Sequence, residues 1–455
     1  MAYLIDDLEK KISEKTATLC IVGMGYVGLP TAVFFAEKGF RVIGCDIKDE
    51  FVKKINNGNS PLSDLNLDER VAKVVKDGRL TATGDVEKAV SLSDIILIIV
   101  PTPTKEGFEP DLCYVISAGE AVSRGLRRGQ LVILESTVYP GVTEEALLPI
   151  LEASGLKAGS DFGLAYCPER YNPGDPEHAI DKVTRIIGGI SEEWAKVACA
   201  LYSEVTEAVP VRDIKTAEMA KIIENTQRDL NIALMNEVAI ICEHLGLDVI
   251  EVIKAAATKW NFHVYWPGAG VGGHCLPKDP WYLVKAAEKR GYHARVITAG
   301  REINDYMPEH IFGLLVKGLN SVGKPVRDAK VLILGLSYKE NVGDLRNTPS
   351  KPLIKKIKEM GGTVYSVDPF VTPKEAMALG VDAHYMTCDD VKDAVDAIVL
   401  MTKHEQFKRD LKCACKGIVF VDGRRVIDEN AIATKGAIYV GLGKGMKDQR
   451  APHNN

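Results

Sequence analysis

Apolar residues in the first part of the chain form short continuous runs that alternate with stretches of helical spacing. The runs lie between residues 18 and 209, in the segments TLCIVGMG, RVIGCDIK, DIILIIVPTP, QLVILEST and FGLAYCPE. Buried strands that alternate with helices are typical of βαβ units and of a parallel sheet. The pattern therefore predicts an α/β domain over residues 1–209.

The spacing of apolar residues becomes helical between Arg212 and Leu247. The residues in this pattern are Met219, Ile222, Ile223, Leu230, Ala233, Leu234, Val238 and Ile241. The segment therefore predicts one long helix, or two in tandem, ended by Gly246. Helices longer than about 25 residues often form a connecting spine and a subunit interface. We expect a central helical domain over residues 210–318 and self-association through it, as a homodimer or a larger oligomer.

The alternation of strands and helices returns after Lys330, in the segments KVLILGLS, GTVYSVDP, AIVLMT and IVFVDGRR. This second pass resembles the first in outline, since KVLILGLSYKEN stands where TLCIVGMGYVGL stood and SVDPF echoes GCDIK. An internal repeat of this kind predicts a second α/β domain, over residues 319–455. The polar tail from Lys444 to Asn455 is expected to be frayed.

Composition and charge narrow the class of protein. Hydrophobic residues make up 46% and charged residues 26% of the 455 positions, as in globular proteins. A net charge of −5 and a pI near 6.1 argue against a nucleic-acid partner. No apolar run approaches the roughly 18 residues of a membrane helix, and the charged N-terminus does not resemble a signal peptide. We expect a cytoplasmic protein with no membrane partner.

The ten cysteines are scattered along the chain rather than clustered in a disulfide framework. This usage is typical of a reducing compartment. Cys413 and Cys415 form the one close pair. A lone C-x-C pair can be half of a metal site, but it is more often incidental, and we expect no metal.

A glycine fingerprint follows the first predicted strand. The residues Gly23, Met24, Gly25, Tyr26, Val27 and Gly28 join that strand to a helical stretch. In a G-x-G-x-x-G turn of this kind the first glycine allows the tight turn, the second lets the backbone approach a pyrophosphate, and the third lets the helix pack on the strand. The motif in this context predicts a Rossmann domain that binds a dinucleotide.

Asp46 lies at the end of the next predicted strand, where a carboxylate can accept the ribose hydroxyls. It would repel a 2′-phosphate, which favours NAD over NADP, and Lys48 is the one nearby cation that could weaken this preference. The alternative is an ordinary glycine turn with a solvated aspartate. In the second α/β domain, residues 335–339 carry bulky side chains in place of the glycines, so this Rossmann-like domain should bind a different nucleotide-like ligand or none.

The segment from Pro267 to Pro280 contains four glycines and a Gly-Gly-His-Cys string. Glycines permit positive φ and close approach to a ligand. Asp279 is expected to cap a helix with Pro280 in its first position, so that Cys275 precedes a helix N-terminus and lies three residues from Lys278. Both features stabilise a thiolate, the form of cysteine that attacks carbonyls.

A buried structural cysteine is the alternative for Cys275, although a glycine-rich loop is a poor place to bury one. His274 is a candidate general base, but adjacent side chains on a loop often diverge. Zinc is not expected, because the two residues have no second pair in the sequence.

The chain resembles the UDP-glucose/GDP-mannose dehydrogenase superfamily over nearly its whole length. The resemblance lies in the order of its features: the NAD fingerprint, the long helix, the GGHC loop and the second Rossmann-like domain. The GGHC and DPWYL strings are most similar to the branch that oxidises UDP-N-acetylmannosamine and UDP-N-acetylglucosamine. The resemblance implies two Rossmann-like domains joined by a central helical dimerisation domain. It also implies an NAD-dependent oxidation at C6 of a UDP-sugar, an activity of polysaccharide biosynthesis.

The resemblance further implies roles for residues in the matching motifs. Thr102 and Thr137 line the NAD site, with Thr137 also at the reacting centre. The catalytic set comprises Glu169 as the acid or base that activates water, Lys221 and Asn225 as stabilisers of the reacting oxygen, Cys275 as the nucleophile, and Asp279 as a carboxylate that orders water or Lys221. The substrate set adds Arg170, Gly272, Lys339, Asp344, Arg346 and Arg424, the last four toward the uridine diphosphate.

The implied chemistry is a four-electron oxidation in which the Cys275 thiolate captures an aldehyde as a thiohemiacetal, which a second oxidation converts to a thioester. Lys221 and Asn225 would stabilise the oxyanion, and water activated by Glu169 would hydrolyse the thioester. The alternative for Lys221 and Glu169 is solvated surface charge.

The exact sugar is left open by residues 258–263. In part of this branch a Pro-Arg here reaches a neighbouring subunit's site, whereas this chain reads TKWNFH. TKWNF is more like enzymes acting on UDP-GlcNAc or UDP-GalNAc, whereas GGHC and DPWYL fit UDP-ManNAc as well; UDP-glucose is a further alternative. Other readings are a single-step β-hydroxyacid dehydrogenase and a non-catalytic nucleotide sensor.

Overall fold

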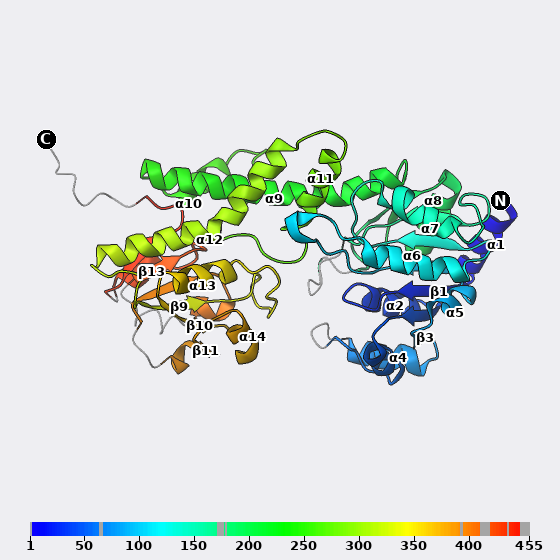
Figure 1. Ribbon diagram of the computed structural model, residues 1–455, viewed down its shortest axis with the longest axis horizontal. Coiled ribbons are helices and arrows are strands. Elements are labelled where there is room, and N and C mark those ends of the chain that lie inside the picture. The colour runs from blue at the N-terminus through cyan, green and yellow to red at the C-terminus, as the bar shows by residue number, and fades with distance from the viewer. Residues whose placement is uncertain are drawn as a thin grey trace. The chain divides into compact units, whose positions relative to one another are not determined.

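The computed structural model describes residues 2–62, 67–170, 177, 180–391, 395–409, 419–434 and 436–445. The chain forms two compact units: Met1–Glu224 with Lys285–Tyr292, and Asn225–Val284 with His293–Asn455 (Figure 1). The pair Cys413 and Cys415, residues 171–176 after Arg170, and most of the C-terminal tail lie outside the described residues. Within the described ranges, no helix has the length and apolar character needed to span a membrane.

The first unit is built on an eight-stranded sheet in the order β3-β2-β1-β4-β5-β6-β7-β8. Neighbouring strands are parallel except for the antiparallel pair β6 and β7. The strands are β1 (Thr18–Val22), β2 (Arg41–Cys45), β3 (Leu80–Thr83), β4 (Ile95–Ile98), β5 (Leu131–Leu134), β6 (Gly163–Tyr166), β7 (Arg185–Gly189) and β8 (Ala208–Pro210). The strand order reverses between β1 and β4, and open α/β sheets bind ligands at such a point. The expected parallel sheet is confirmed.

Helices cover both faces of this sheet because successive strand residues point to opposite sides. Leu19 and Ile21 of β1 join one apolar core, whereas Cys20 and Val22 join the other. The first core is closed by α1 (Ala2–Ser13), α2 (Gly28–Glu37), α4 (Asp68–Lys76) and α8 (Glu192–Ser203). The second is closed by α5 (Val86–Ser91), α6 (Cys113–Gly125) and α7 (Leu148–Glu152). A short α3 (Asp49–Asn56) follows β2.

The second unit contains a six-stranded parallel sheet in the order β11-β10-β9-β12-β13-β14 (Figure 1). Its strands are β9 (Lys330–Leu334), β10 (Thr363–Val367), β11 (Ala383–Tyr385), β12 (Ala397–Leu400), β13 (Val419–Asp422) and β14 (Ile438–Gly441). This order repeats that of the first six strands of the other sheet. The expected second Rossmann-like domain is therefore confirmed. Its helices are α13 (Ser350–Glu359), α14 (Pro373–Ala378), α15 (Glu405–Arg409) and α16 (Glu429–Ala433).

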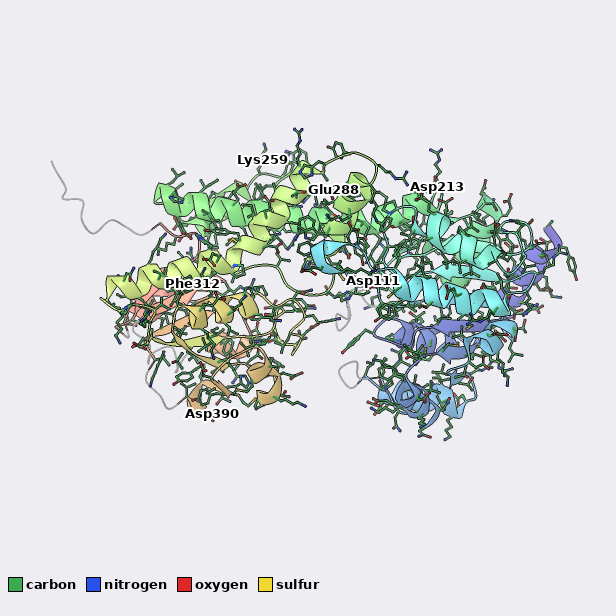
Figure 2. All side chains as sticks on the ribbon, viewed as in Figure 1. Asp111, Asp213, Lys259, Glu288, Phe312 and Asp390 are labelled. Atoms are coloured by element: carbon green, nitrogen blue, oxygen red, sulfur yellow. The ribbon has the colours of Figure 1, made fainter. Side chains whose placement is uncertain are left out.

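The helical middle consists of α9 (Ile214–Leu245), α10 (Val249–Ala256), α11 (Asp279–Glu288) and α12 (Arg295–Ser321). α9 is one helix rather than two, and Gly246, with a φ of +70°, ends it. Asp213, labelled in Figure 2, accepts hydrogen bonds from the N and Oγ1 of Thr216 at the helix start. In the second unit, Ile311 of α12 and Ile333 of β9 share one apolar core, so the helices and the C-terminal sheet pack together.

Candidate active site

The glycine turn between β1 and α2 has the geometry that a dinucleotide requires. Gly23 has a φ of +100°, and a Cβ there would lie 2.2 Å from the Ile99 oxygen. A Cβ on Gly28 would lie 1.8 Å from the Gly23 oxygen, so a side chain there would collide with the turn. At Gly25 an added Cβ meets nothing within 4 Å. The open side of the turn thus lies at Gly25, where a pyrophosphate could approach the backbone.

Asp46 at the end of β2 faces this turn. Its Oδ2 accepts a hydrogen bond from the Met24 amide at 3.0 Å, and its Oδ1 accepts one from the Lys48 amide at 2.9 Å. The Lys48 ammonium lies over the Phe51 ring, 4.7 Å from its centroid. The residues of this half-sheet therefore fit NAD, with a half-buried carboxylate at the ribose position.

The next two strand ends, β4 and β5, are tied together by Ser136. Its hydroxyl accepts a hydrogen bond from the Val100 amide at 2.9 Å and donates one to the Val100 oxygen at 2.8 Å. Thr102 is buried and Thr137 half-buried in the two loops that follow. In the glycine turn, Val27 is half-buried and the Tyr26 side chain is exposed.

A buried ion pair supports the loop that carries Glu169. Arg185 donates to the Pro168 oxygen at 3.0 Å, and its guanidinium lies 3.6 Å from Glu135. Burial raises the pKa of Glu135, and Arg185 opposes the rise. Sequence reasoning missed both residues, although a charged residue within an apolar strand pattern is a usable signal. Glu169 itself is half-buried, directly after this anchored backbone.

The neighbouring Arg170 is held by helix α9. It forms an ion pair with Glu224 at 2.7 Å and donates to the Thr184 oxygen at 2.8 Å. Lys221, one turn before Glu224, is only 8% exposed. Its burial argues against a solvated surface charge.

Asn225 and Asp279 belong to the second unit, where the Asn225 amide donates to Asp279 at 2.6 Å. α11 begins at Asp279, so the expectation that this residue precedes the helix is wrong by one position. The reason is a tight turn in which the amides of Lys278 and Asp279 both donate to the Cys275 oxygen. The Asp279 side chain is only 1% exposed, and its hydrogen bond reaches across to α9.

Cys275 is exposed and forms no disulfide, which excludes a buried structural cysteine. Desolvation, followed by the charges of Lys278 and Arg346, lowers the pKa of the adjacent His274 to about 4, so its imidazole is neutral at pH 7. Cys20, Cys45, Cys113, Cys167, Cys199 and Cys242 are also free, whereas Cys388 is disulfide-bonded.

The glycines before Cys275 pack closely against the C-terminal domain. A Cβ on Gly272 would lie 2.5 Å from the Tyr338 Cβ, and one on Gly273 would lie 2.7 Å from the Tyr338 ring. The Gly273 amide also donates to the Arg346 oxygen at 2.9 Å, and the Asn347 amide group donates to the Gly273 oxygen at 2.9 Å. Sequence reasoning missed Tyr338 and Asn347 because the two segments are over sixty residues apart in the chain.

Of the other expected substrate residues, Lys339, Asp344 and Arg346 lie on the same loop as Tyr338, whereas Arg424 follows β13. Arg346 pairs with Asp344 through two nitrogens, and Lys339 is half-buried beside Tyr338. Arg424 donates to the Met401 oxygen, and burial lowers its pKa to about 10. A Cβ on Gly268 would lie 2.4 Å from Nη1 of Arg424.

The second Rossmann-like domain cannot hold a dinucleotide as the first does. Gly335 repeats the positive φ of Gly23, at +84°, and Asp368 stands where Asp46 does. Asp368, however, is fully buried and accepts from the amides of Leu336 and Ser337 and from His404. Its carboxylate is therefore not available to a ribose.

A glycine turn with an acidic partner at the switch point of a parallel sheet is typical of the NAD-binding domain of a dehydrogenase. Family models match three successive segments: the NAD binding domain of the UDP-glucose/GDP-mannose dehydrogenase family over residues 17–206, its central domain over 215–306, and its UDP binding domain over 332–429. The chain belongs to the UDP-glucose/GDP-mannose dehydrogenase family and is an NAD-dependent oxidoreductase.

Individual relatives cover most of the chain. A UDP-N-acetyl-D-glucosamine 6-dehydrogenase of Pseudomonas aeruginosa is 40% identical, over 87% of this chain and 92% of its own. A solved UDP-D-ManNAc dehydrogenase of Pyrococcus horikoshii is 36% identical, with a TM-score of 0.86 over 94% of this chain and 99% of its own. A solved NDP-N-acetyl-D-galactosaminuronic acid dehydrogenase of Methanosarcina mazei is 35% identical, with a TM-score of 0.84 over 96% and 98%.

Proposed function

We propose that the protein oxidises the C6 hydroxyl of a UDP-N-acetylhexosamine to a carboxylate, with Cys275 as covalent nucleophile. The observation that carries this proposal is the exposed thiol of Cys275 in a turn that leads directly into helix α11. The N-terminus of a helix favours negative charge, which stabilises the thiolate form of Cys275. NAD, when bound, accepts the hydride from C6, and the balanced reaction consumes two NAD and one water for each sugar.

The protein's own residues have separable proposed roles. Lys221 and Asn225 stabilise the oxyanion of the thiohemiacetal, as a cation and an amide donor. Asp279 orients Asn225 through their 2.6 Å hydrogen bond. Glu169 takes a proton from the water that hydrolyses the thioester, and Arg185 fixes the backbone just before it.

Binding of the nucleotide is proposed at the C-terminal domain. Lys339, Arg346 and Arg424 supply positive charge for the uridine diphosphate, and Asp344 holds the Arg346 guanidinium in one orientation. The loop containing Gly272 packs on the same domain, so occupancy of the UDP site would also order the segment that ends in Cys275.

The sugar is proposed to be UDP-GlcNAc or UDP-ManNAc, since relatives carrying both names are found. Purified protein is assayed for NADH with UDP-Glc, UDP-GlcNAc, UDP-GalNAc, UDP-ManNAc and GDP-Man, and the acid is identified by mass spectrometry. Two NADH per sugar support the proposal. One NADH per sugar would show that oxidation stops after a single step, as in a β-hydroxyacid dehydrogenase, and would refute the four-electron reaction. No NADH with any sugar would refute the assignment.

The role of the thiol is tested with Cys275→Ser, for which Cys113→Ser is the matched control because it also replaces an exposed cysteine. We expect the Cys275 variant to bind NAD normally and to form no acid, because serine is a far weaker nucleophile at neutral pH. Full turnover by that variant would refute covalent catalysis.

We also propose that the chain has three functional domains, residues 1–209, 210–318 and 319–455, and acts in the cytoplasm as a homodimer or larger oligomer through its central helices. Leu234, Ile241 and Leu245 are exposed on α9 at helical spacing, and Trp260 is 91% exposed. An exposed apolar stripe of this kind favours burial against a second copy. Sedimentation as a monomer at assay concentration would contradict this part.

A further inference from the structure

Glu218 is a fully buried carboxylate that sequence reasoning assigned no role. It lies on α9, one turn before Lys221, and its side chain is 0% exposed. Its Oε2 accepts a hydrogen bond from the Gly141 amide at 2.5 Å. Its Oε1 accepts two from Thr143, from the amide at 2.9 Å and from the hydroxyl at 2.7 Å. Three donors from one loop therefore converge on a single carboxylate.

The donors belong to the loop that follows β5 and contains Thr137. The start of this loop is anchored by Ser136, whose hydroxyl bonds both backbone atoms of Val100 at the end of β4. The far end is anchored by Glu218 through Gly141 and Thr143. Thr137 lies between the two anchors, so its position depends on both.

The same segment is contacted by the residues that directly follow α11. The Lys289 ammonium lies over the Tyr139 ring, 5.4 Å from its centroid, and Arg290 pairs with Glu145 at 2.7 Å. These contacts are exposed, and exposed ion pairs contribute only about 0–1 kcal/mol. The buried bonds to Glu218 are thus the stronger restraint on the loop.

We propose that Glu218 is a positioning residue that locks the Thr137 loop to the turn of α9 carrying Lys221. Above its raised pKa of about 7 the ionised Glu218 carboxylate accepts on both oxygens without presenting a donor of its own. A glutamine would place an N–H group against the donors of Gly141 or Thr143. The inference rests on the proposed roles of Thr137 and Lys221, which it links through one side chain.

The test is the Glu218→Gln variant, with Glu120→Gln on the exposed face of α6 as the control for loss of one charge. We expect kcat to fall by about 10- to 100-fold, since a misplacement near 1 Å can lower a rate by about 10²-fold. The KM for the UDP-sugar should change less than about twofold, because UDP is bound by the other unit. If Glu218 had only a structural role, the variant would contain less folded enzyme, but each folded molecule would keep its normal kcat and KM. Active-site titration measures the amount of folded enzyme.

Thr143 provides a second, milder variant. Thr143→Val removes only the hydroxyl donor and should lower kcat less than Glu218→Gln, whereas Thr143→Ser keeps the donor and should retain activity. If the two residues act through one another, the double variant Glu218→Gln/Thr143→Val should be no slower than Glu218→Gln alone. Wild-type kcat in folded Glu218→Gln, or fully additive effects, would overturn the inference.

The NAD affinity separates failure of this inference from failure of the proposed function. Titration with NAD needs no sugar, and Glu218→Gln should weaken binding by about three- to tenfold if Thr137 lines the cofactor. If the wild-type protein oxidises no sugar while the variant still binds NAD more weakly, the proposed function is refuted and the positioning role of Glu218 stands. If neither the NAD affinity nor kcat changes in the variant, the positioning role of Glu218 is refuted and the proposed function stands.

Discussion

Replacing Gly25 with alanine should separate cofactor binding from folding. The added Cβ would meet no protein atom within 4 Å, and the φ of Gly25 is not positive. Alanine can therefore adopt the native backbone, and reduced freedom of the unfolded chain should leave stability unchanged or raise it by about 0.4–1 kcal/mol. The methyl group would instead occupy the space through which a pyrophosphate reaches the backbone amides.

The loss of affinity follows from the bonds that the methyl group prevents. A hydrogen bond to a charged group contributes about 1.5–3 kcal/mol. Losing one of them should raise the Kd for NAD roughly 10- to 100-fold, because each 1.4 kcal/mol is about a factor of ten. Calorimetric titration with NAD measures the Kd, and thermal denaturation without NAD measures the stability.

Gly28→Ala is the matched comparison, because its Cβ would lie 1.8 Å from the Gly23 oxygen. Overpacking of this kind lowers the free energy of unfolding by about 1–3 kcal/mol or more. We expect a Tm lower by roughly 2–4 °C for each kcal/mol lost. Wild-type NAD affinity in Gly25→Ala, or a Tm as low as that of Gly28→Ala, would refute the assignment of the open side of the turn.

Three further outcomes are expected. Gly273 has a φ of +95°, and an added Cβ would lie 2.7 Å from the Tyr338 ring, so Gly273→Ala should lower the free energy of unfolding by about 2–4 kcal/mol. At Gly246 an added Cβ meets no atom within 4 Å, so Gly246→Ala should lower it only by the backbone strain of about 1–2 kcal/mol. Burial raises the pKa of Glu218 from 4.5 to about 7. The protonated carboxyl therefore stabilises the folded state by about 3 kcal/mol, a contribution that is present at pH 4.5 and lost as the pH rises through 7. Denaturation midpoints of wild type and Glu218→Gln that change in parallel with pH would contradict this. Asp46→Asn should narrow the preference for NAD over NADP by about tenfold, measured as a ratio of Kd values, because the charge that repels a 2′-phosphate is removed.

Local patterns were sufficient to predict the two sheets and the long helix. The continuous apolar run of β1 and the helical spacing from Met219 to Ile241 are patterns of near neighbours in the chain. The glycine turn could also be predicted from the sequence, because side chains at Gly23 and Gly28 would collide with atoms of the same βαβ unit or of the adjacent strand end. The burial of Lys221 was only suggested by its apolar neighbours, since burial depends on what packs over a helix.

Contacts between distant segments were decided by the tertiary structure. Glu218 and Thr143 are 75 residues apart, and the pattern around a glutamate on a helix does not distinguish a solvated carboxylate from one that holds a loop. Gly272 and Gly273 pack against Tyr338, a contact that no local pattern in the sequence indicated. Sequence by itself determined the secondary structure, the two Rossmann-like sheets and the dinucleotide turn, because these follow from local backbone geometry and side-chain periodicity. Only the tertiary structure decided which polar groups are buried and paired. Hydrogen bonds and close packing join residues that are far apart in the chain, and no local sequence pattern indicates such contacts.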